Sequence, residues 1–499
     1  MYKHIPNWCI VLKDKKLIIS KIVAIIIIEY IFLGILYYTP SIGVGLQLLF
    51  GIISLIISGS LMRSIGQLKG FGPLYIAGTK RGIQIIDAAA KKNKWFWDEL
   101  PMWGVVLAFG LLSYPLLKGR INKKTYILGI VSLIVLTQFI LPYMQIALQF
   151  ITLPQIQSTI ASASSAPQSN SINPLSIIAL IVSIIAGMSG YLILFVLLNA
   201  LLILNGIWLF ITSVGAGSPK TSYVTSQVPG VVPVIPGIDL PFAAGIISLA
   251  ILLIIHEFSH GVLARKAKIK VKSVGILGFS VIPVGGFVEP DDKQVKKLDP
   301  ISQTKIFAAG ISMNFLATLV FFVLLMVVAL YLLPGVVINN GVIISAVTPH
   351  YPAYGILKPG MHILKWNNQS ISSITNLTKA SASDLPGSVV SVSTNTGNYT
   401  FIAKASNQTS KGLIGVNLYQ SSGVANGIYP AIIYFLYTVF ALSFMLNFLV
   451  AVVNLLPIPL FDGMWIYNAN ITNKRFIRFM YYFVIILLAI NIFQWVFYL

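Results

Sequence analysis

Charged residues, and acidic ones above all, are scarce in this chain of 499 residues. Only 9% of the residues are charged, with 13 Asp and Glu against 34 Lys and Arg, and 57% are hydrophobic. A soluble protein carries about 25% charged residues, so the composition excludes that class. Apolar stretches of about twenty residues recur along the chain, and each is long enough to cross a bilayer as a helix. The sequence therefore predicts an integral membrane protein with many helical spans.

Cysteine is almost absent from the sequence. Cys9 is the single cysteine, which excludes an intramolecular disulfide, so any domain outside the membrane must be stabilised by its own hydrophobic core. The formal charge of +21 does not indicate nucleic-acid binding, because no basic segment is interleaved with aromatic residues. Lys and Arg of multispanning proteins gather in cytoplasmic loops, beside anionic lipid headgroups. We therefore expect the lipid bilayer, and no nucleic acid, as a partner.

The chain divides into an N-terminal region and a core. Residues 1–213 are predicted to form an accessory membrane region of about four to six spans, followed by a Gly/Pro-rich linker over residues 214–240. Residues 102–117 are apolar but short, and form either a short span or a re-entrant segment. Residues 174–213 carry no charge, and one helix of that length would reach about 60 Å, twice the thickness of a bilayer core. We therefore expect a tight helical hairpin that turns near Ala186–Gly190.

The core is predicted to contain about four transmembrane helices and one exported domain. Two helices belong to residues 241–334 and two to residues 428–499, with residues 335–427 between them. Basic residues follow the first core span, and "NKRFIR" precedes the last, which marks both connections as cytoplasmic. Residues 335–427 are then extracytoplasmic. Four N-x-[ST] sequons agree with this placement, at Asn368, Asn376, Asn398 and Asn407.

The stretch "LLIIHEFSHGVLARKAK", residues 252–268, places ionisable groups next to a long apolar run. His256 and His260 are four residues apart, so on a helix both imidazoles lie on one face and can reach one Zn²⁺. Glu257 can accept a proton from a water at the metal, since zinc lowers the pKa of such a water to near 7. Arg265 marks the cytoplasmic boundary, which places His256 about 13 Å into the apolar layer. Ionisable groups at that depth are costly without a metal or partner.

Two histidines leave a catalytic zinc one protein ligand short. The other histidines, His4, His350 and His362, belong to the N-terminal tail or to the exported segment. The candidate third ligand is Asp462 in "NLLPIPLFDG", where two prolines break the helix and exposed backbone at membrane depth requires a cavity. A proline-rich break also ends ordinary spans at the interface, so this stretch alone leaves both interpretations open.

Together the two stretches resemble the motifs of the site-2 proteases, intramembrane zinc metalloproteases, and the composition favours an archaeal-type member. "HEFSH" is similar to the first motif of this family. "NLLPIPLFDG" is similar to the second, N-x-x-P-x-P-x-L-D-G, with Phe461 in place of the usual Leu. The resemblance covers about residue 229 to the C-terminus. It implies one catalytic zinc ion whose ligands are His256, His260 and Asp462. It also implies that Glu257 is the catalytic base and that the side-chain amide of Asn454 helps to hold the substrate.

Two shorter motifs lie between these stretches. "SVIPVGGFVEPDD", residues 280–292, looks like the re-entrant β-hairpin of the family, proposed to present substrate, which makes Gly285 and Gly286 substrate-binding candidates. "GISMN", residues 310–314, fits the G-x-x-x-N motif of the family, where a small residue allows close helix contact. Asn314 is a further substrate-binding candidate, and it either orients the site or bonds a neighbouring helix.

Residues 342–371 resemble the PDZ domain that is inserted in this family. The pattern of strand, Pro-Ala turn, "GILKPG" and strand is similar, but Met361 takes the place of the usual Asp. A PDZ fold can capture an extended peptide by strand addition. Here the domain is either such a peptide-binding module or only a size filter or spacer.

The resemblance implies an intramembrane zinc metalloprotease that cleaves transmembrane protein substrates within or near their membrane segments, in regulated intramembrane proteolysis. It also implies a location in the cell membrane, with the active site toward the cytoplasm and the PDZ-like domain outside. Two alternatives are a transporter or channel lined by the polar residues, and an inactive protease-like scaffold. No inverted repeat favours the transporter, and the four intact catalytic positions argue against the inactive scaffold.

Overall fold

The computed structural model describes most of the chain, over residues 15–37, 39, 44–79, 81–148, 174–216, 240–405 and 411–494. Almost all of the predicted linker over residues 214–240 lies outside the described residues, as do His4 and Asn407. The chain forms two compact units. The first consists of Met1–Val323 together with Thr438–Leu499, and the second is Leu324–Tyr437.

Long apolar helices make up most of the described chain, which confirms the prediction of a polytopic helical membrane protein. In the described ranges, nine helices have the length and hydropathy needed to cross a membrane. Five of them precede the linker, over Leu17–Leu36, Leu49–Gly66, Lys94–Leu116, Lys123–Leu148 and Ile177–Gly215. Four follow it, over Phe242–Lys266, Pro300–Gly335, Ile428–Val453 and Lys474–Phe493.

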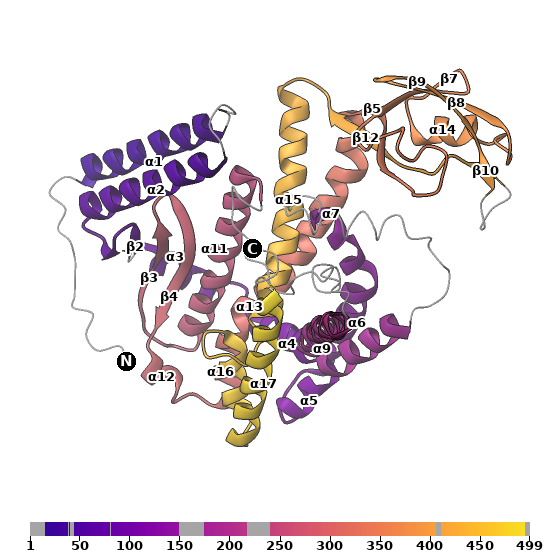
Figure 1. The fold of residues 1–499 in the computed structure, drawn as a ribbon. Coiled ribbons are helices and arrows are strands. Elements are labelled where there is room, and N and C mark those ends of the chain that lie inside the picture. Colours follow the sequence, from indigo (N-terminus) through magenta and orange to yellow (C-terminus); the bar gives the residue numbers. More distant parts are fainter. Residues whose placement is uncertain are drawn as a thin grey trace. The chain divides into compact units, whose positions relative to one another are not determined.

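Among its described residues, the N-terminal region is helical apart from one short hairpin (Figure 1). Asn122 caps one of its helices, α6, by accepting a hydrogen bond from the backbone N–H of Lys124. The short apolar segment near residues 102–117 belongs to a span candidate, of which 67% is buried, so other helices and not lipid surround it. The helical segments are α1 (Lys15–Tyr37), α2 (Val44–Gly66), α3 (Arg81–Lys91), α4 (Lys94–Phe109), η1 (Gly110–Leu112), α5 (Ser113–Leu116), α6 (Lys123–Val135), η2 (Leu136–Ile140), η3 (Leu141–Tyr143), α7 (Met144–Leu148) and α9 (Pro174–Gly215).

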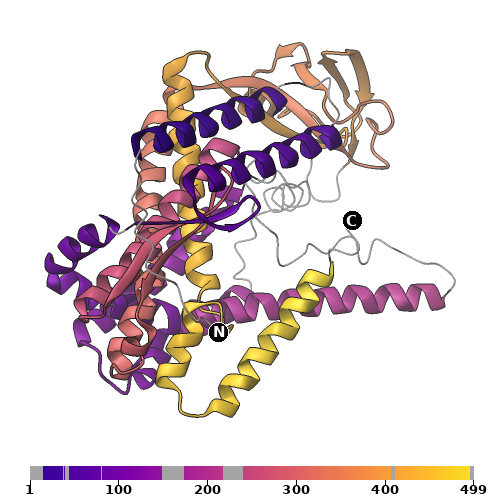
Figure 2. The same ribbon diagram turned by 90° about the vertical axis from the view of Figure 1, so that its left-hand side faces the viewer.

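Helix α9, the long magenta helix in Figure 2, is interrupted at Gly187. This residue has φ 65° and ψ −160°, a conformation that is almost restricted to glycine. A Cβ at Gly187 would lie 2.4 Å from the backbone of Ala108, and one at Gly110 would lie 2.3 Å from the carbonyl oxygen of Ile184. The break falls inside the predicted range Ala186–Gly190, and close backbone contact with the end of α4 explains its position. The tight hairpin that we expected here is instead a kink between two halves of α9.

The core helices flank the two sequence motifs. Helix α15 ends at Val453, α16 begins at Asp462, and Pro457 and Pro459 lie in the irregular segment between them, as their lack of a backbone N–H predicts. Asn473 caps α17 by accepting from two backbone N–H groups. The helical segments are α11 (Phe242–Lys266), α12 (Asp292–Val295), α13 (Pro300–Val327), η4 (Val328–Leu332), η5 (Leu333–Gly335), α15 (Ile428–Val453), α16 (Asp462–Asn470) and α17 (Lys474–Phe493).

A four-stranded antiparallel sheet joins the N-terminal region to the core. Its order is β1-β2-β3-β4, with strands β1 (Lys69–Phe71), β2 (Leu74–Thr79), β3 (Val271–Phe279) and β4 (Ile282–Pro290). The turn between β3 and β4 lies at Ser280 and Val281, because Phe279 pairs with Ile282. Gly285 and Gly286 both lie inside β4. Strands β1 and β2 were not expected from the sequence, because their neighbour β3 lies about 200 residues further along the chain.

The second unit contains the remaining sheets around its own hydrophobic core. The larger sheet has the order β12-β5-β6-β8-β9, with β7 paired to β6. Its core includes Val342, Trp366 and Phe401, and the buried carboxylate of Asp384 accepts a hydrogen bond from Trp366 Nε1 at 2.8 Å. The elements are β5 (Val337–Val347), β6 (His362–Trp366), β7 (Gln369–Ser370), α14 (Ile374–Ala380), β8 (Val389–Thr394), β9 (Gly397–Ile402), β10 (Lys404–Ala405), β11 (Gly412–Leu413) and β12 (Val416–Val424).

Candidate metal centre

Helix α11 presents two imidazoles on one face. His256 and His260 are one turn apart, and their Nε2 atoms lie 3.2 Å from each other. Both side chains are largely buried, with exposed fractions of 10% and 13%. Two ring nitrogens this close, in a region of low polarity, need a shared cation or acid between them.

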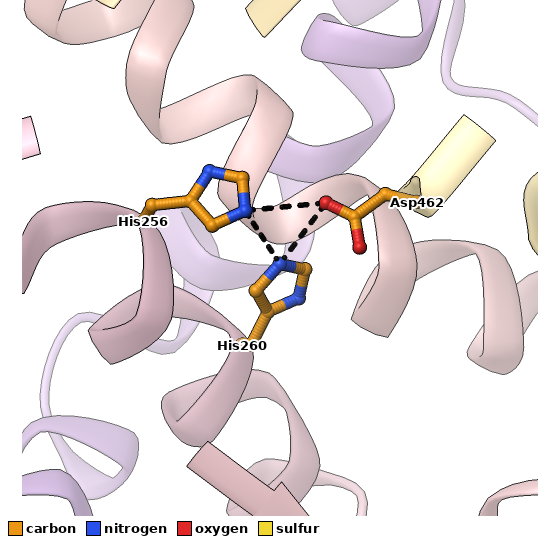
Figure 3. Close-up of side chains that lie close together, drawn as sticks. All are labelled: His256, His260 and Asp462. Atoms are coloured by element: carbon orange, nitrogen blue, oxygen red, sulfur yellow. Dashed lines mark hydrogen bonds and ion pairs between the residues drawn. The ribbon is translucent and has the colours of Figure 1, made fainter. Parts of the chain in front are cut away.

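Asp462 completes the group from the first residue of α16 (Figure 3). Its Oδ2 lies 3.3 Å from His256 Nε2 and 3.2 Å from His260 Nε2. Zn²⁺ binds imidazole nitrogen and carboxylate oxygen at about 2.0–2.1 Å in a tetrahedral arrangement, which puts neighbouring ligand atoms about 3.3 Å apart. The three atoms form a triangle of this size. The structure therefore brings together all three predicted ligands, and their donor atoms and spacing fit those of a zinc site.

The outward ring nitrogen of each histidine has a partner on α13. His260 Nδ1 lies 2.8 Å from the carbonyl oxygen of Ile306, so Nδ1 carries the ring proton and Nε2 keeps its lone pair. His256 Nδ1 lies 3.1 Å from the side-chain amide of Asn314. With the amide nitrogen toward the ring, the buried Asn314 Oδ1 has no partner among the described residues. Turning the amide satisfies this oxygen and gives His256 the tautomer that binds metal through Nε2.

Gly310 allows α13 to approach the two imidazoles. A Cβ at this position would lie 2.4 Å from His260 Nε2 and 2.5 Å from His256 Nε2. These distances are far below van der Waals contact, so no other residue fits without moving a ligand. The predicted close contact at the first residue of "GISMN" is therefore made with the candidate ligands themselves.

Glu257 is tied to the edge strand β4. Its Oε2 accepts a hydrogen bond of 2.9 Å from the backbone N–H of Val288. A Cβ at Gly286 would lie 2.9 Å from Glu257 Cγ, whereas one at Gly285 would meet Leu277 at an ordinary 3.5 Å. Of the two predicted glycines, Gly286 is therefore the one that lets the strand pack against the glutamate, and Gly285 faces the other way.

Asn454 lies at the start of the irregular segment that leads to Asp462. Its carbonyl oxygen accepts a 2.7 Å hydrogen bond from the N–H of Gly463, which closes the segment into a loop. A Cβ at Gly463 would lie 2.6 Å from the backbone of Leu455, so close approach, and not an unusual φ, requires glycine here. In the described part of the chain, the half-buried side-chain amide of Asn454 makes no hydrogen bond and is free to bind a ligand.

Residues of the N-terminal region pack against the helices that form the centre, a role that we did not expect from the sequence. Ile86 of α3 occupies the space beside Gly261 of α11, where a Cβ would lie 2.6 Å from Ile86 Cδ1. Ser312 of α13 packs on Gly104 of α4, where a Cβ would lie 1.8 Å from its Oγ. The rings of Phe109 and Tyr467 are 5.5 Å apart, which brings α4 against α16. The amphipathic pattern of α3 was the available signal, since its apolar face must be buried against the protein or the membrane interface.

Comparison with known proteins, like the geometry of the site, indicates a metallopeptidase. Residues 244–492, essentially half of the chain, match the family model described as Peptidase family M50. The uncharacterized protein MJ0971 of Methanocaldococcus jannaschii is 29% identical over 232 residues, which are 46% of this chain and 58% of the relative. The chain thus matches somewhat more than half the length of this relative. Both motifs, with His256 and Asp462, fall inside residues 244–492. Over these residues the chain belongs to peptidase family M50, the family of the site-2 proteases.

Proposed function

We propose that this protein is an intramembrane zinc metalloprotease that hydrolyses peptide bonds within or near the transmembrane segments of membrane proteins. The observation that carries the proposal is the triangle of His256 Nε2, His260 Nε2 and Asp462 Oδ2, with sides of 3.2–3.3 Å. Family membership and the long apolar helices agree with it. Regulated intramembrane proteolysis is the process that such an activity serves.

In the proposed hydrolysis, His256, His260 and Asp462 would hold the zinc ion and Glu257 would transfer the proton. A bound zinc ion would polarise the scissile carbonyl and lower the pKa of a water molecule toward 7. The water oxygen bonds to the carbonyl carbon while Glu257 takes its proton. The C–N bond then breaks, and Glu257 passes this proton to the leaving amine. Because Oε2 is held by Val288 N–H, Oε1 is the oxygen that exchanges the proton.

The edge of β4 supports the presentation of the substrate as an extended strand. In the described sheet β4 is an end strand, and the Val288 N–H points away from β3, toward Glu257. Because backbone groups alternate along a strand, Gly286 directs its N–H to the same side as Val288. A substrate paired there would regain hydrogen bonds that its helix loses on unwinding, which otherwise cost several kcal/mol each in a membrane. The amide of Asn454 is a second group suited to hold this backbone.

The charges support a site that opens toward the cytoplasm. Helix α11 ends in Arg265 and Lys266, and α17 begins with Lys474 and Arg475, as expected of cytoplasmic ends. Residues 335–427, which form most of the second unit, would then be outside the cell membrane. We propose a PDZ-like role for these residues, in which a substrate segment is bound or its size is filtered.

The decisive test compares Glu257→Gln with wild type in purified full-length protein. The substrate is a synthetic single-span peptide of leucine and alanine with a central asparagine–glycine pair. We expect stoichiometric zinc in both proteins and a loss of cleavage of about a hundredfold to ten-thousandfold in the variant, as for removal of a general base. Glu289→Gln is the matched control, since Glu289 bonds Ser273 in the sheet, and it should cleave normally.

Zinc analysis of Asp462→Ala tests the third ligand. We expect this variant to lose its metal during purification, because two histidines alone hold zinc weakly. Full zinc content in Asp462→Ala, or normal cleavage by Glu257→Gln, would refute the assigned roles. A wild-type protein that binds zinc and cleaves no membrane peptide would favour the inactive scaffold, and one that passes solutes across vesicles without zinc would favour the transporter.

A further inference from the structure

The turn between β3 and β4 is held by residues of the N-terminal region. Ser280 has no exposed surface and a φ of 54°, which is uncommon for a residue other than glycine. Its N–H donates to the carbonyl oxygen of Pro73 at 3.0 Å. Its own carbonyl oxygen accepts from the Tyr75 hydroxyl at 2.8 Å, and its Oγ lies 2.5 Å from Ser58 Oγ. Every polar group of Ser280 is therefore bonded to α2 or to the β1–β2 hairpin.

Helix α2 packs closely against this turn because it has a glycine at the point of contact. A Cβ at Gly59 would lie 2.8 Å from Pro73 Cβ and 2.8 Å from Ser280 Cα, so the helix backbone touches both turns directly. At the end of α2, Arg63 Nε donates to the carbonyl oxygen of Gly72 at 3.0 Å. Figure 1 shows the ends of β3 and β4 reaching α2. We call Ser58, Gly59, Pro73 and Tyr75 the hairpin anchor.

The anchor and the catalytic residue hold opposite ends of the same strand. Strand β4 begins next to the anchored Ser280, and near its far end the Val288 N–H bonds Glu257 Oε2. A two-stranded hairpin alone is marginally stable, and here β1 and β2 extend it to four strands. Strand β4 is thus held at both ends. The N-terminal region holds the end next to Ser280, and Glu257 of the candidate active site bonds the end near Val288.

We infer that the hairpin anchor positions the substrate strand, so that the N-terminal region sets which bond of the substrate meets Glu257. Ser58, Gly59 and Tyr75 are positioning residues, since they act through β4 and touch no reacting atom. The inference rests on the proposed proteolytic function. A misplacement of about 1 Å in a reacting group can lower the rate by roughly a hundredfold, so a small movement of α2 has a measurable effect.

Two glycine substitutions in the same helix isolate the anchor. Gly59→Ala places a Cβ 2.8 Å from Ser280 Cα, whereas a Cβ at Gly51 meets only Leu33 and Leu36, at 3.7 and 3.8 Å. We expect Gly59→Ala to keep stoichiometric zinc, to cleave the single-span peptide roughly tenfold to a hundredfold more slowly, and to cut at several neighbouring bonds. Gly51→Ala should match wild type in zinc, rate and cleavage site. Mass spectrometry of the products identifies the bonds.

A disulfide distinguishes a fixed anchor from a contact that opens in each catalytic cycle. Ser58→Cys and Ser280→Cys, combined with Cys9→Ser, leave two cysteines whose side chains meet. We expect efficient cross-linking on oxidation, and an oxidised protein that cleaves at the wild-type bond at the rate of its reduced form.

Three results would overturn the inference. The first is that Gly59→Ala cleaves at the wild-type rate and at the wild-type bond. The second is that Gly59→Ala loses its zinc together with its activity. The third is that the disulfide inactivates the protein and that reduction restores the activity. If wild type itself cleaves no peptide, the proposed function fails first, and cross-linking still shows whether the anchor exists.

Discussion

The imidazole of His256 can bind a metal through Nε2 only when Nδ1 carries the ring proton. That proton needs an acceptor in this buried place, and the amide of Asn314, 3.1 Å away, is in position to supply one. The buried Oδ1 of Asn314 otherwise lacks a partner in the described chain. Of the two roles expected for Asn314, orienting the site or bonding a neighbouring helix, the contact favours the first.

Substitution of Asn314 tests this tautomer argument. Asn314→Leu removes the acceptor at similar volume, and we expect zinc affinity to fall by roughly tenfold to a hundredfold, the usual effect of losing an outer partner of a metal ligand. Asn314→Asp keeps an acceptor oxygen and should retain tight binding. Competition with a fluorescent chelator measures both affinities. Equal affinities for the two variants would show that Asn314 serves helix packing alone.

At the scale of elements, α3 is docked on α11 by two kinds of contact. Ile86 is 1% exposed and fills the space above Gly261. Asp87 and Arg265 form an ion pair of 2.5 Å, with exposed fractions of 34% and 31%. A partly exposed ion pair contributes about 0–1 kcal/mol, whereas truncating a fully buried isoleucine to alanine costs about 2–5 kcal/mol. Apolar burial therefore decides the docking of α3.

Unfolding measurements on three variants check this ranking. We expect Ile86→Ala to lower the free energy of unfolding by about 2–5 kcal/mol, and Asp87→Asn by no more than about 1 kcal/mol. Ile85→Ala is the matched control, because Ile85 in the same helix is 66% exposed. Tryptophan fluorescence during denaturation in detergent reports the stability of each protein. A larger effect from Asp87→Asn than from Ile86→Ala would reverse the argument.

At the scale of the whole molecule, the first compact unit is larger than the region that matches the family. The match covers residues 244–492, yet the unit extends from Met1 to Val323 and resumes at Thr438. Elements α3 and α4 contact α11, α13 and α16, the three helices that contribute to the metal centre. The N-terminal region is thus part of the packing around the site, in addition to the accessory role expected from its sequence.

Removal of the N-terminal region tests this dependence. A fragment of residues 240–499 would leave the faces of α11 and α13 around Gly261 and Ser312 without their partners. We expect this fragment to retain less than about a tenth of the zinc of the full chain, since a metal site binds only when it is folded. Co-expression with residues 1–216 should restore zinc, measured after size-exclusion chromatography. Full zinc in the isolated fragment would show that the family region folds independently.

The sequence by itself determined the membrane class, the helix that carries the two histidines, and the candidate metal ligands on it. These features depend on local information, because twenty apolar residues, a spacing of four between His256 and His260, and prolines near Asp462 act within one segment. Only the tertiary structure decided that Asp462 meets both histidines, that Asn314 faces His256, and that α2 holds Ser280. These contacts join residues that are distant along the chain. Their energies depend on close packing at glycines such as Gly59 and Gly310, and a local sequence pattern does not show which distant residue packs there.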